Sequence, residues 1–301
     1  MSKILVVGSS NTDMVVKTER FPQPGETIIG GHFFMFPGGK GANQAVAAAR
    51  LAGDVTFVCK VGNDIFGKNA VEGFVKEGIN TDYIFTDPTE PSGVALITVN
   101  AQGQNEIVVA SGANGTLSES DITKIIPQID EASIVLMQLE TPLSTVEFVS
   151  QWAAQKGKKV ILNPAPAQKL PEKFYKSLYL ITPNETETQI LTGIQVTDSS
   201  TALQAAELLR RWGVQNVIIT MGASGVFVLT DDFTGQISAP IVKAVDTTAA
   251  GDVFNGALAV ALAKGRGWEE ACQFACRAAS ISVTRMGAQA SAPYLHELIL
   301  L

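Results

Sequence analysis

The sequence predicts an α/β fold in which a mostly parallel sheet is covered by helices on both faces. Short runs rich in β-branched residues alternate with longer amphipathic or alanine-rich stretches along most of the 301 residues. Parallel strands require a crossover connection of helical length, and such a sheet is buried on both faces. Hydrophobic residues make up 46% of the chain, which is enough to fill one large core. These observations define the expected fold class.

The expected strands are short apolar runs bounded by polar residues or glycine. They are residues 4–7, 55–61, 134–139, 160–162, 178–181 and 217–220. The expected helices lie between these runs and have helical apolar spacing or a high alanine content. They are residues 40–51, 66–77, 118–129, 143–156 and 199–212, followed by a late helix that begins near Val253.

Two stretches break this alternation, at about residues 12–36 and 92–110. In the second, strand-like residues 94–99 and 106–109 flank a turn with no helix between them, which is typical of a hairpin. Because such strands cannot extend a parallel sheet, we expect a small separate sheet that acts as a lid or a subunit contact. Since no repeat or linker divides the chain, we expect a single domain over residues 1–301.

Composition excludes several classes of partner. The net charge is −7, from 22 basic and 29 acidic side chains without a Lys/Arg cluster, which disfavours nucleic acid. The apolar run 256–263 is too short to cross a membrane, and residues 4–8 indicate a strand rather than a signal peptide. Cys59, Cys272 and Cys276 are too few for a disulfide framework. We expect buried thiols rather than a metal clip, in a reducing cytoplasm.

Small residues run from Ala244 to Asp252 directly into the late apolar helix. The first amides of a helix lack intrahelical acceptors, and the helix dipole adds positive charge, so this turn should attract a transferring phosphoryl group. Asp252 beside that anion could take a proton from an attacking hydroxyl. An ordinary helix start also contains Asp and Gly. A second glycine-rich element at 37–45 opens another alanine-rich helix, which suggests a second ligand.

Five segments together resemble the ribokinase family of sugar kinases, over residues 8 to about 291. They are GSSNTD at 8–13, GGKGANQA at 38–45, NPAPA at 163–167, PNETE at 183–187 and DTTAAGD at 246–252. The resemblance implies a Rossmann-like sheet with a β lid, often dimerised through that lid, and ATP-dependent phosphorylation of a sugar hydroxymethyl group. The GGKGANQA form favours D-ribose as substrate and D-ribose 5-phosphate and ADP as products.

Other functions remain open alternatives. A deoxyribokinase, or another sugar or nucleoside kinase, belongs to the same family; Asn11 argues mildly against the deoxy sugar, because its amide can satisfy one more hydroxyl. A dinucleotide-dependent oxidoreductase would have GxGxxG after the first strand, where this chain has GSSN. A non-catalytic sugar-binding protein would not need Asp252.

The resemblance assigns Asp252 as the catalytic base, with the amides of Ala249, Ala250, Gly251 and Asp252 holding the transferring oxygens. Many relatives have Gly where this chain has Ala249; the methyl leaves the amide donor intact. Polar groups able to pair with sugar hydroxyls occur at the matching sugar-binding positions. These positions are Asn11, Asp13, Gly39, Lys40, Asn43, Glu140 and Asp252. Without the resemblance, most of them would be interpreted as turn or surface residues.

The resemblance also implies a nucleotide site. Its positions are Asn184, Thr220, Gly222, Ser224, Gly225, Gly251 and Cys276. Gly222 and Gly225 would fit an ordinary β-turn equally well. Because relatives commonly have Asn or His in place of Cys276, we expect adenine binding to depend more on apolar packing.

Two cations are implied as well. Asn184 and Glu187 form the NxxE pattern that organises magnesium through water, and Asn184 could also cap a helix. A potassium site would be formed largely by carbonyl oxygens. Its positions are Asp246, Thr248, Ser282, Arg285, Gly287 and Ser291.

Overall fold

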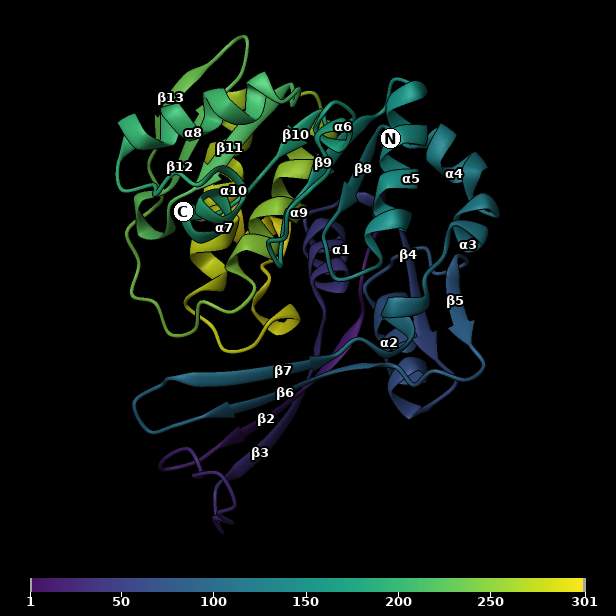
Figure 1. Ribbon diagram of the computed structural model, residues 1–301, viewed down its shortest axis with the longest axis vertical. Coiled ribbons are helices and arrows are strands. Elements are labelled where there is room, and N and C mark those ends of the chain that lie inside the picture. Colours follow the sequence, from purple (N-terminus) through teal and green to yellow (C-terminus); the bar gives the residue numbers. More distant parts are fainter. Residues whose placement is uncertain (1, 300–301) are drawn as a thin grey trace.

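The computed structural model describes residues 2–299 and has a large, mostly parallel sheet at its centre (Figure 1). The strand order is β13-β12-β11-β10-β9-β8-β1-β4-β5. Pairing is parallel from β5 to β11 and antiparallel for β12 and β13, so the predicted fold class is confirmed. The strands are β1 (Lys3–Val7), β4 (Asp54–Gly62), β5 (Ile84–Asp87), β8 (Ile134–Met137), β9 (Lys159–Leu162), β10 (Leu180–Ile181), β11 (Asn216–Thr220), β12 (Val226–Leu229) and β13 (Thr234–Ile237).

Helices cover both faces of the sheet, which explains why successive residues in the middle of its central strands are apolar. In β1, Ile4 and Val6 enter one core cluster, whereas Leu5 and Val7 enter the other. The first cluster is covered by α1 (Lys40–Arg50), α2 (Ile65–Lys76), α9 (Ala250–Ala263) and α10 (Trp268–Ser282). The second is covered by α3 (Glu119–Thr123), α4 (Ile126–Glu131), α5 (Leu143–Gln155), α6 (Glu172–Tyr175), α7 (Glu185–Thr192) and α8 (Ser199–Arg211).

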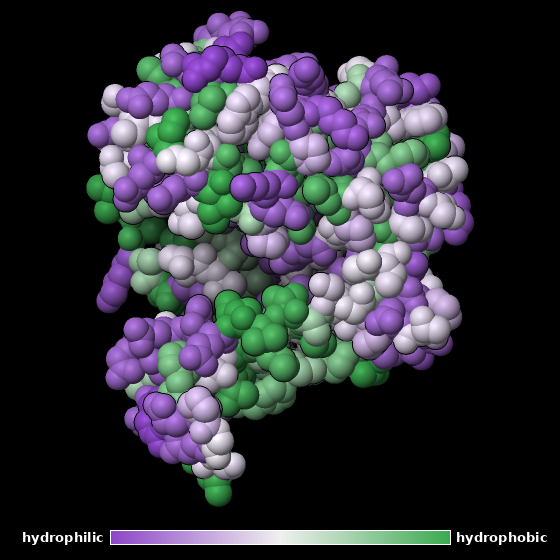
Figure 2. Space-filling model, viewed as in Figure 1, coloured by the Kyte–Doolittle hydropathy of each residue, from purple (hydrophilic) through white to green (hydrophobic). Residues whose placement is uncertain are grey.

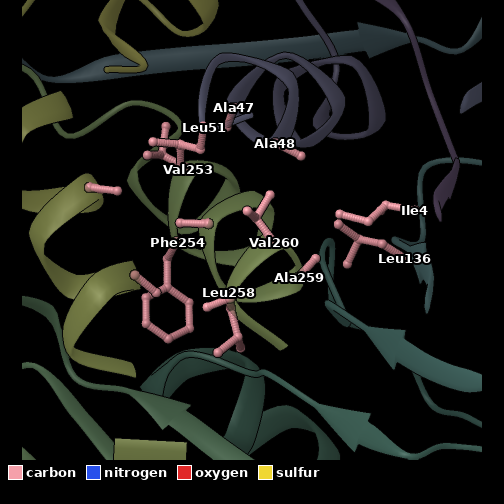
Figure 3. Packing of buried hydrophobic residues seen from close by; sticks show 14 of the residues in the cluster. Ile4, Ala47, Ala48, Leu51, Leu136, Val253, Phe254, Leu258, Ala259 and Val260 are labelled. Atoms are coloured by element: carbon pink, nitrogen blue, oxygen red, sulfur yellow. The ribbon is translucent and has the colours of Figure 1, made fainter. Parts of the chain in front are cut away.

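Helices α1 and α9 pack directly against each other, and this contact positions the site described below. Ala47 and Ala48 of α1 lie beside Val253 and Val260 of α9 (Figure 3). Gly256 permits the close approach, since a Cβ there would lie 2.6 Å from the Gln44 carbonyl oxygen. The first turns of the two helices therefore lie side by side.

A second, four-stranded sheet projects from the large one (Figure 1). Its strands, in the order β3-β2-β6-β7, are β3 (His32–Gly38), β2 (Asn11–Lys17), β6 (Gly93–Val99) and β7 (Asn105–Ala110). The outer pairs are antiparallel, as the hairpin pattern predicts, whereas the central β2–β6 pair is parallel. Figure 2 shows a hollow between this small sheet and the rest of the molecule, with hydrophobic residues gathered beside it.

The structure differs from the predicted elements in several places. The helix expected at 118–129 is two helices, α3 and α4, because Pro127 at the start of α4 has no N–H to continue the α3 hydrogen-bond ladder. The strand expected at 178–181 consists of two residues, and α10 was absent from the predicted helices. All three cysteines are free and buried, as expected. Among the described residues, no helix is both long and apolar enough to cross a membrane.

Candidate active site

Glycines seat the start of α1 against the link between β1 and β2. A Cβ on Gly41 would lie 2.5 Å from the Ser9 nitrogen, and one on Gly39 would lie 2.7 Å from the Asn11 nitrogen. Gly39 also has a φ of 89°, a conformation that side chains disfavour. The backbone of this glycine-rich element therefore touches the carboxyl end of β1, where ligands bind in open α/β sheets.

Glu140 and Asn11 line a cavity of about 450 Å³, here called the polar cavity. Glu140 Oε2 accepts hydrogen bonds from the Lys40 backbone N–H (3.0 Å) and from the Ser9 hydroxyl (2.5 Å). Asn11 Oδ1 accepts from Asn114 Nδ2 (2.7 Å). The backbone of Ser10 fixes the Asn114 amide by donating to its Oδ1 and accepting from its Nδ2. The Asn11 Nδ2 group is thereby left to donate to a ligand.

Lys40 lies among four carboxylates, from Asp13, Glu140, Glu187 and Asp252. Their charges, with Asp252 contributing most, raise the pKa of Lys40 against the opposing effect of burial. Burial, aided by the charges of Glu140 and Asp252, raises the pKa of Asp13 to about 6. Gly38 allows Asp13 this position, because a Cβ there would lie 2.3 Å from the carboxylate oxygens. Lys40 therefore compensates part of the negative charge of these four carboxylates.

Asp252 lies in the first turn of α9 and is 5% exposed. Its Oδ2 accepts a hydrogen bond from Asn43 Nδ2 (2.9 Å), and its Oδ1 accepts one from Gln44 Nε2 (3.0 Å). The carboxylate is thus held by two neutral amides from α1 and lies within electrostatic reach of Asp13 and Lys40. This arrangement brings together the predicted base and the residues predicted to bind a sugar.

The turn before Asp252 presents backbone amides, as expected for an anion site. Within residues 2–299, the N–H groups of Ala249, Gly251 and Asp252 have no acceptor, whereas that of Ala250 donates to the Thr247 carbonyl (3.3 Å). Gly251 has open space around the position of a Cβ. Three of the four predicted amides are therefore available to bind an anion, and that of Ala250 is weakly engaged.

Ala249 has a left-handed backbone, with φ 60° and ψ 12°. This conformation costs a non-glycine residue about 1–2 kcal/mol, part of which is offset by the lower entropy of alanine in the unfolded chain. We expect Ala249→Gly to raise the free energy of unfolding in urea by about 0.5–1 kcal/mol. Ala52→Gly, at φ 61°, should act in the same direction, whereas Ala263→Gly in the last turn of α9 should destabilise the protein. A loss of stability in Ala249→Gly would contradict the strain argument.

A second cavity, of about 460 Å³ and here called the apolar cavity, reaches the same turn. Its lining includes six of the seven residues predicted to bind a nucleotide, namely Asn184, Thr220, Gly222, Gly225, Gly251 and Cys276. Ser224 is not among the lining residues; it lies in the short turn Gly222–Ser224, and its carbonyl accepts from Gln236 Nε2 (3.0 Å). Burial raises the pKa of Cys276 to about 12, so a neutral thiol faces the cavity. Phe254 and Val283 add apolar surface to the lining.

Asn184 and Glu187 form a capping box at the start of α7. Asn184 Oδ1 accepts from the Glu187 N–H, and Glu187 Oε2 accepts from the Asn184 N–H, both at 2.8 Å. Asn184 therefore caps the helix, and the capping box uses only one of the two carboxylate oxygens of Glu187. Burial raises the pKa of Glu187. No group of three or more His, Cys, Asp or Glu side chains in the described chain is arranged to hold a metal directly.

Asp246 joins the turn before α9 to the segment after α10. Its Oδ1 accepts from the Thr248 N–H and its Oδ2 from the Gly287 N–H, both at 2.9 Å. Partial burial opposes ionisation, but these hydrogen bonds outweigh it and lower the pKa of Asp246. Among the other residues predicted to bind potassium, Ser282 and Ser291 donate to carbonyls of their own turns, and Arg285 pairs with Glu297. The arrangement brings Asp246, Thr248 and Gly287 together.

Sequence reasoning missed two buried amides of the site, Gln44 and Asn114. Gln44 lies within the GGKGANQA element, where a Gln on an alanine-rich helix is itself a signal, and the structure shows it fully buried. Asn114 lies in the short helix Gly112–Thr116 after β7, and no local pattern distinguishes it from a turn residue.

Comparison with known proteins agrees with this geometry. A model of pfkB family carbohydrate kinases matches residues 1–295. A ribokinase from Haemophilus influenzae is 46% identical over 98% of this chain and 97% of its own length, and a deoxyribokinase from Salmonella typhi is 39% identical over 98% and 96%. The structure of an Arabidopsis thaliana ribokinase complexed with ribose and ATP matches with a TM-score of 0.92 and 34% identity, over 99% of this chain and 98% of that one. The chain therefore belongs to the pfkB family of carbohydrate kinases.

Membership of this family makes the chain an ATP-dependent sugar kinase. The predicted family and the predicted class of enzyme are both confirmed.

Proposed function

We propose that this sugar kinase phosphorylates the terminal hydroxymethyl group of D-ribose, giving D-ribose 5-phosphate and ADP, with Asp252 as general base. One observation carries the proposal: the Asp252 carboxylate is held by Asn43 and Gln44 at the start of α9, in an electrostatic cluster with Asp13, Lys40 and Glu140. The relatives named ribokinase, including one complexed with ribose and ATP, support ribose as the sugar.

The chemistry divides between Asp252 and the turn before it. The sugar hydroxyl oxygen forms a bond to the γ-phosphorus of ATP, the bond from that phosphorus to the bridging oxygen breaks, and ADP leaves. The hydroxyl proton passes to an oxygen of Asp252. Because phosphoryl transfer depends mainly on alignment and charge stabilisation, the base acts late, while the amides of Gly251 and Asp252 stabilise the transferring oxygens.

The choice between ribose and deoxyribose rests on Asn11. Asn114 directs the Asn11 Nδ2 group toward a ligand, so a sugar that lacks the matching hydroxyl leaves this donor unpaired. The test is ADP release from ATP and magnesium with a panel of pentoses, hexoses and nucleosides, with and without potassium. We expect kcat/KM for ribose to exceed that for 2-deoxyribose by about tenfold or more. A preference for 2-deoxyribose would favour a deoxyribokinase instead.

Two cations complete the proposal. Glu187, through its free carboxylate oxygen, would hold a water molecule of a magnesium ion, with Asn184 fixing its orientation. Magnesium bound to ATP would neutralise phosphate charge during transfer. Potassium would bind near Asp246, mainly through carbonyl oxygens of the segments that this residue joins, and would fix the turn before α9.

The pKa of Asp13 predicts how sugar use depends on pH. Asp13 accepts hydrogen bonds from sugar hydroxyls best when ionised, and its pKa of about 6 means that the acid form accumulates below that pH. We expect kcat/KM for the sugar to fall about tenfold per pH unit below this value, at saturating ATP and magnesium. The pH profile of kcat/KM for the free enzyme measures this effect. Asp13→Asn should lower kcat/KM and lose this inflection; an unaltered inflection would assign it to another group.

We also propose a single domain over residues 1–301 whose small sheet acts as a lid and as a homodimer contact, in a cytoplasmic protein. Large apolar side chains are exposed on that sheet, among them Phe33 (61%), Met35 (51%), Leu96 (53%) and Val108 (67%). A cluster of exposed apolar side chains is typical of a protein–protein contact. We expect sedimentation to give a dimer that Leu96→Lys with Val108→Lys dissociates. A wild-type monomer would contradict the dimer.

A further inference from the structure

A chain of buried side-chain amides meets the Asp252 carboxylate. Gln44 is fully buried, and its Nε2 donates to Asp252 Oδ1 (3.0 Å) and to Asn163 Oδ1 (3.1 Å). The Gln44 Oε1 accepts from Gln138 Nε2 (2.6 Å). Gln138 and Asn163 directly follow β8 and β9, so the ends of two adjacent strands converge on one side chain of α1.

The network fixes which way the Gln44 amide faces. Asn163 Nδ2 donates to the Thr182 carbonyl (3.3 Å), and a carbonyl can only accept, so Asn163 Oδ1 must face Gln44. The carboxylate of Asp252, in its proposed role as base, also can only accept. Both neighbours therefore require the nitrogen of Gln44, and both hydrogens of that nitrogen are used.

The same network holds Asp252 without a direct ion pair from any residue in the described range 2–299. Two neutral amides, Asn43 Nδ2 on Oδ2 and Gln44 Nε2 on Oδ1, hold the two carboxylate oxygens. Gly256 permits the helix contact that places Gln44 there. The network has an energetic cost at its last amide: Gln138 Oε1 is buried without a hydrogen-bond partner in residues 2–299.

We propose that Gln44 is a positioning residue for catalysis, which fixes the plane of the Asp252 carboxylate so that an oxygen faces the attacking hydroxyl. The inference rests on the proposed function, in which Asp252 accepts the hydroxyl proton. Gln44 is fully buried and its amide is bonded to Asp252, Asn163 and Gln138, so it acts through Asp252 rather than on a ligand. Its loss should change the rate of turnover more than the binding of either substrate.

The first test removes the donor and keeps the unbranched shape. In Gln44→Met we expect kcat to fall about 10–100-fold, the range for losing a hydrogen bond to a charged group, while KM for ribose and ATP changes less than about threefold. Steady-state kinetics measure both, and thermal unfolding checks that the variant is folded. Gln128→Met is the matched control: Gln128 lies on α4, donates to the Tyr83 hydroxyl and should leave kcat unchanged.

The second test uses Gln44→Glu, which places a second carboxyl group against Asp252. Two adjacent carboxyl groups tend to share a proton, so we expect the acid limb of the kcat–pH profile to move to higher pH by about one unit or more. Activity should then recover in part as the pH rises, whereas Gln44→Met should show no such recovery. A purely structural role for Gln44 would lower the stability of Gln44→Met without lowering its kcat.

Two outcomes overturn the inference: kcat within about threefold of wild type in folded Gln44→Met, or an unmoved acid limb in Gln44→Glu. If Gln44→Met does not fold, the profile of Gln44→Glu decides alone, and if neither folds, Gln44 is structural and the inference is wrong. A wild-type protein that does not phosphorylate ribose, or a fully active Asp252→Asn variant, would instead defeat the proposed function.

Discussion

Replacing Asp252 by Asn should lower kcat by about 1,000-fold, the middle of the range for a general base in a positioned site. Asn has the same shape but cannot accept the hydroxyl proton, so the alignment of sugar and ATP remains while the proton acceptor is lost. One of the donors from Asn43 and Gln44 would then face an amide N–H, which adds a small cost in stability. The measurement is ADP release at saturating substrates.

The binding of ribose and ATP to Asp252→Asn must also be measured, because a loss of binding would lower turnover as well. Calorimetry should give dissociation constants for ribose and for ATP within a few-fold of the wild-type values. Asp232→Asn, at an exposed position between β12 and β13, should leave both turnover and binding unchanged. Undiminished turnover in Asp252→Asn would remove Asp252 from the role of base.

Replacing Lys40 by Met should have the second-largest effect, because Lys40 is the cation that compensates Asp13, Glu140, Glu187 and Asp252. Truncating one partner of a buried charge pair in a binding site costs about 3 kcal/mol, which corresponds to a fall in kcat/KM for the sugar of about 100-fold. Mutual repulsion of the remaining carboxylates should raise the pKa of Asp13 above its present value of about 6. Initial rates over a range of ribose concentrations measure the effect.

The stability of Lys40→Met should depend on pH in a defined direction. A carboxyl group whose folded pKa is raised disfavours folding above that pKa, and the penalty disappears as protonation occurs at lower pH. The loss of unfolding free energy relative to wild type should therefore be largest near pH 8 and smaller near pH 5. Lys68→Met, at an exposed position on α2, should show neither the kinetic effect nor this pH dependence. A loss that is equal at both pH values would exclude carboxylate repulsion as its cause.

The strands and helices were largely predictable because they depend on the local spacing of apolar residues along the sequence. Apolar residues at every position of residues 4–7 indicate a strand buried on both faces, and β1 divides them between two cores. The break between α3 and α4 was missed although Pro127 marks it, because the apolar spacing continues across the proline. The parallel β2–β6 pair could not be predicted, since the partner of a strand is chosen by distant parts of the chain.

The candidate site divides in the same way. A backbone that must approach another backbone or an anion closely needs small residues at the point of approach, as at Gly39, at Gly41 and before Asp252. This requirement is local, so the sequence alone determined the glycine-rich element and the anion-binding turn. Only the tertiary structure decided what holds Asp252. Gln44 is 208 residues away along the chain, and the contact exists because α1 and α9 cross at Gly256. Side-chain hydrogen bonds between distant segments depend on helix packing, which no local pattern of residues encodes.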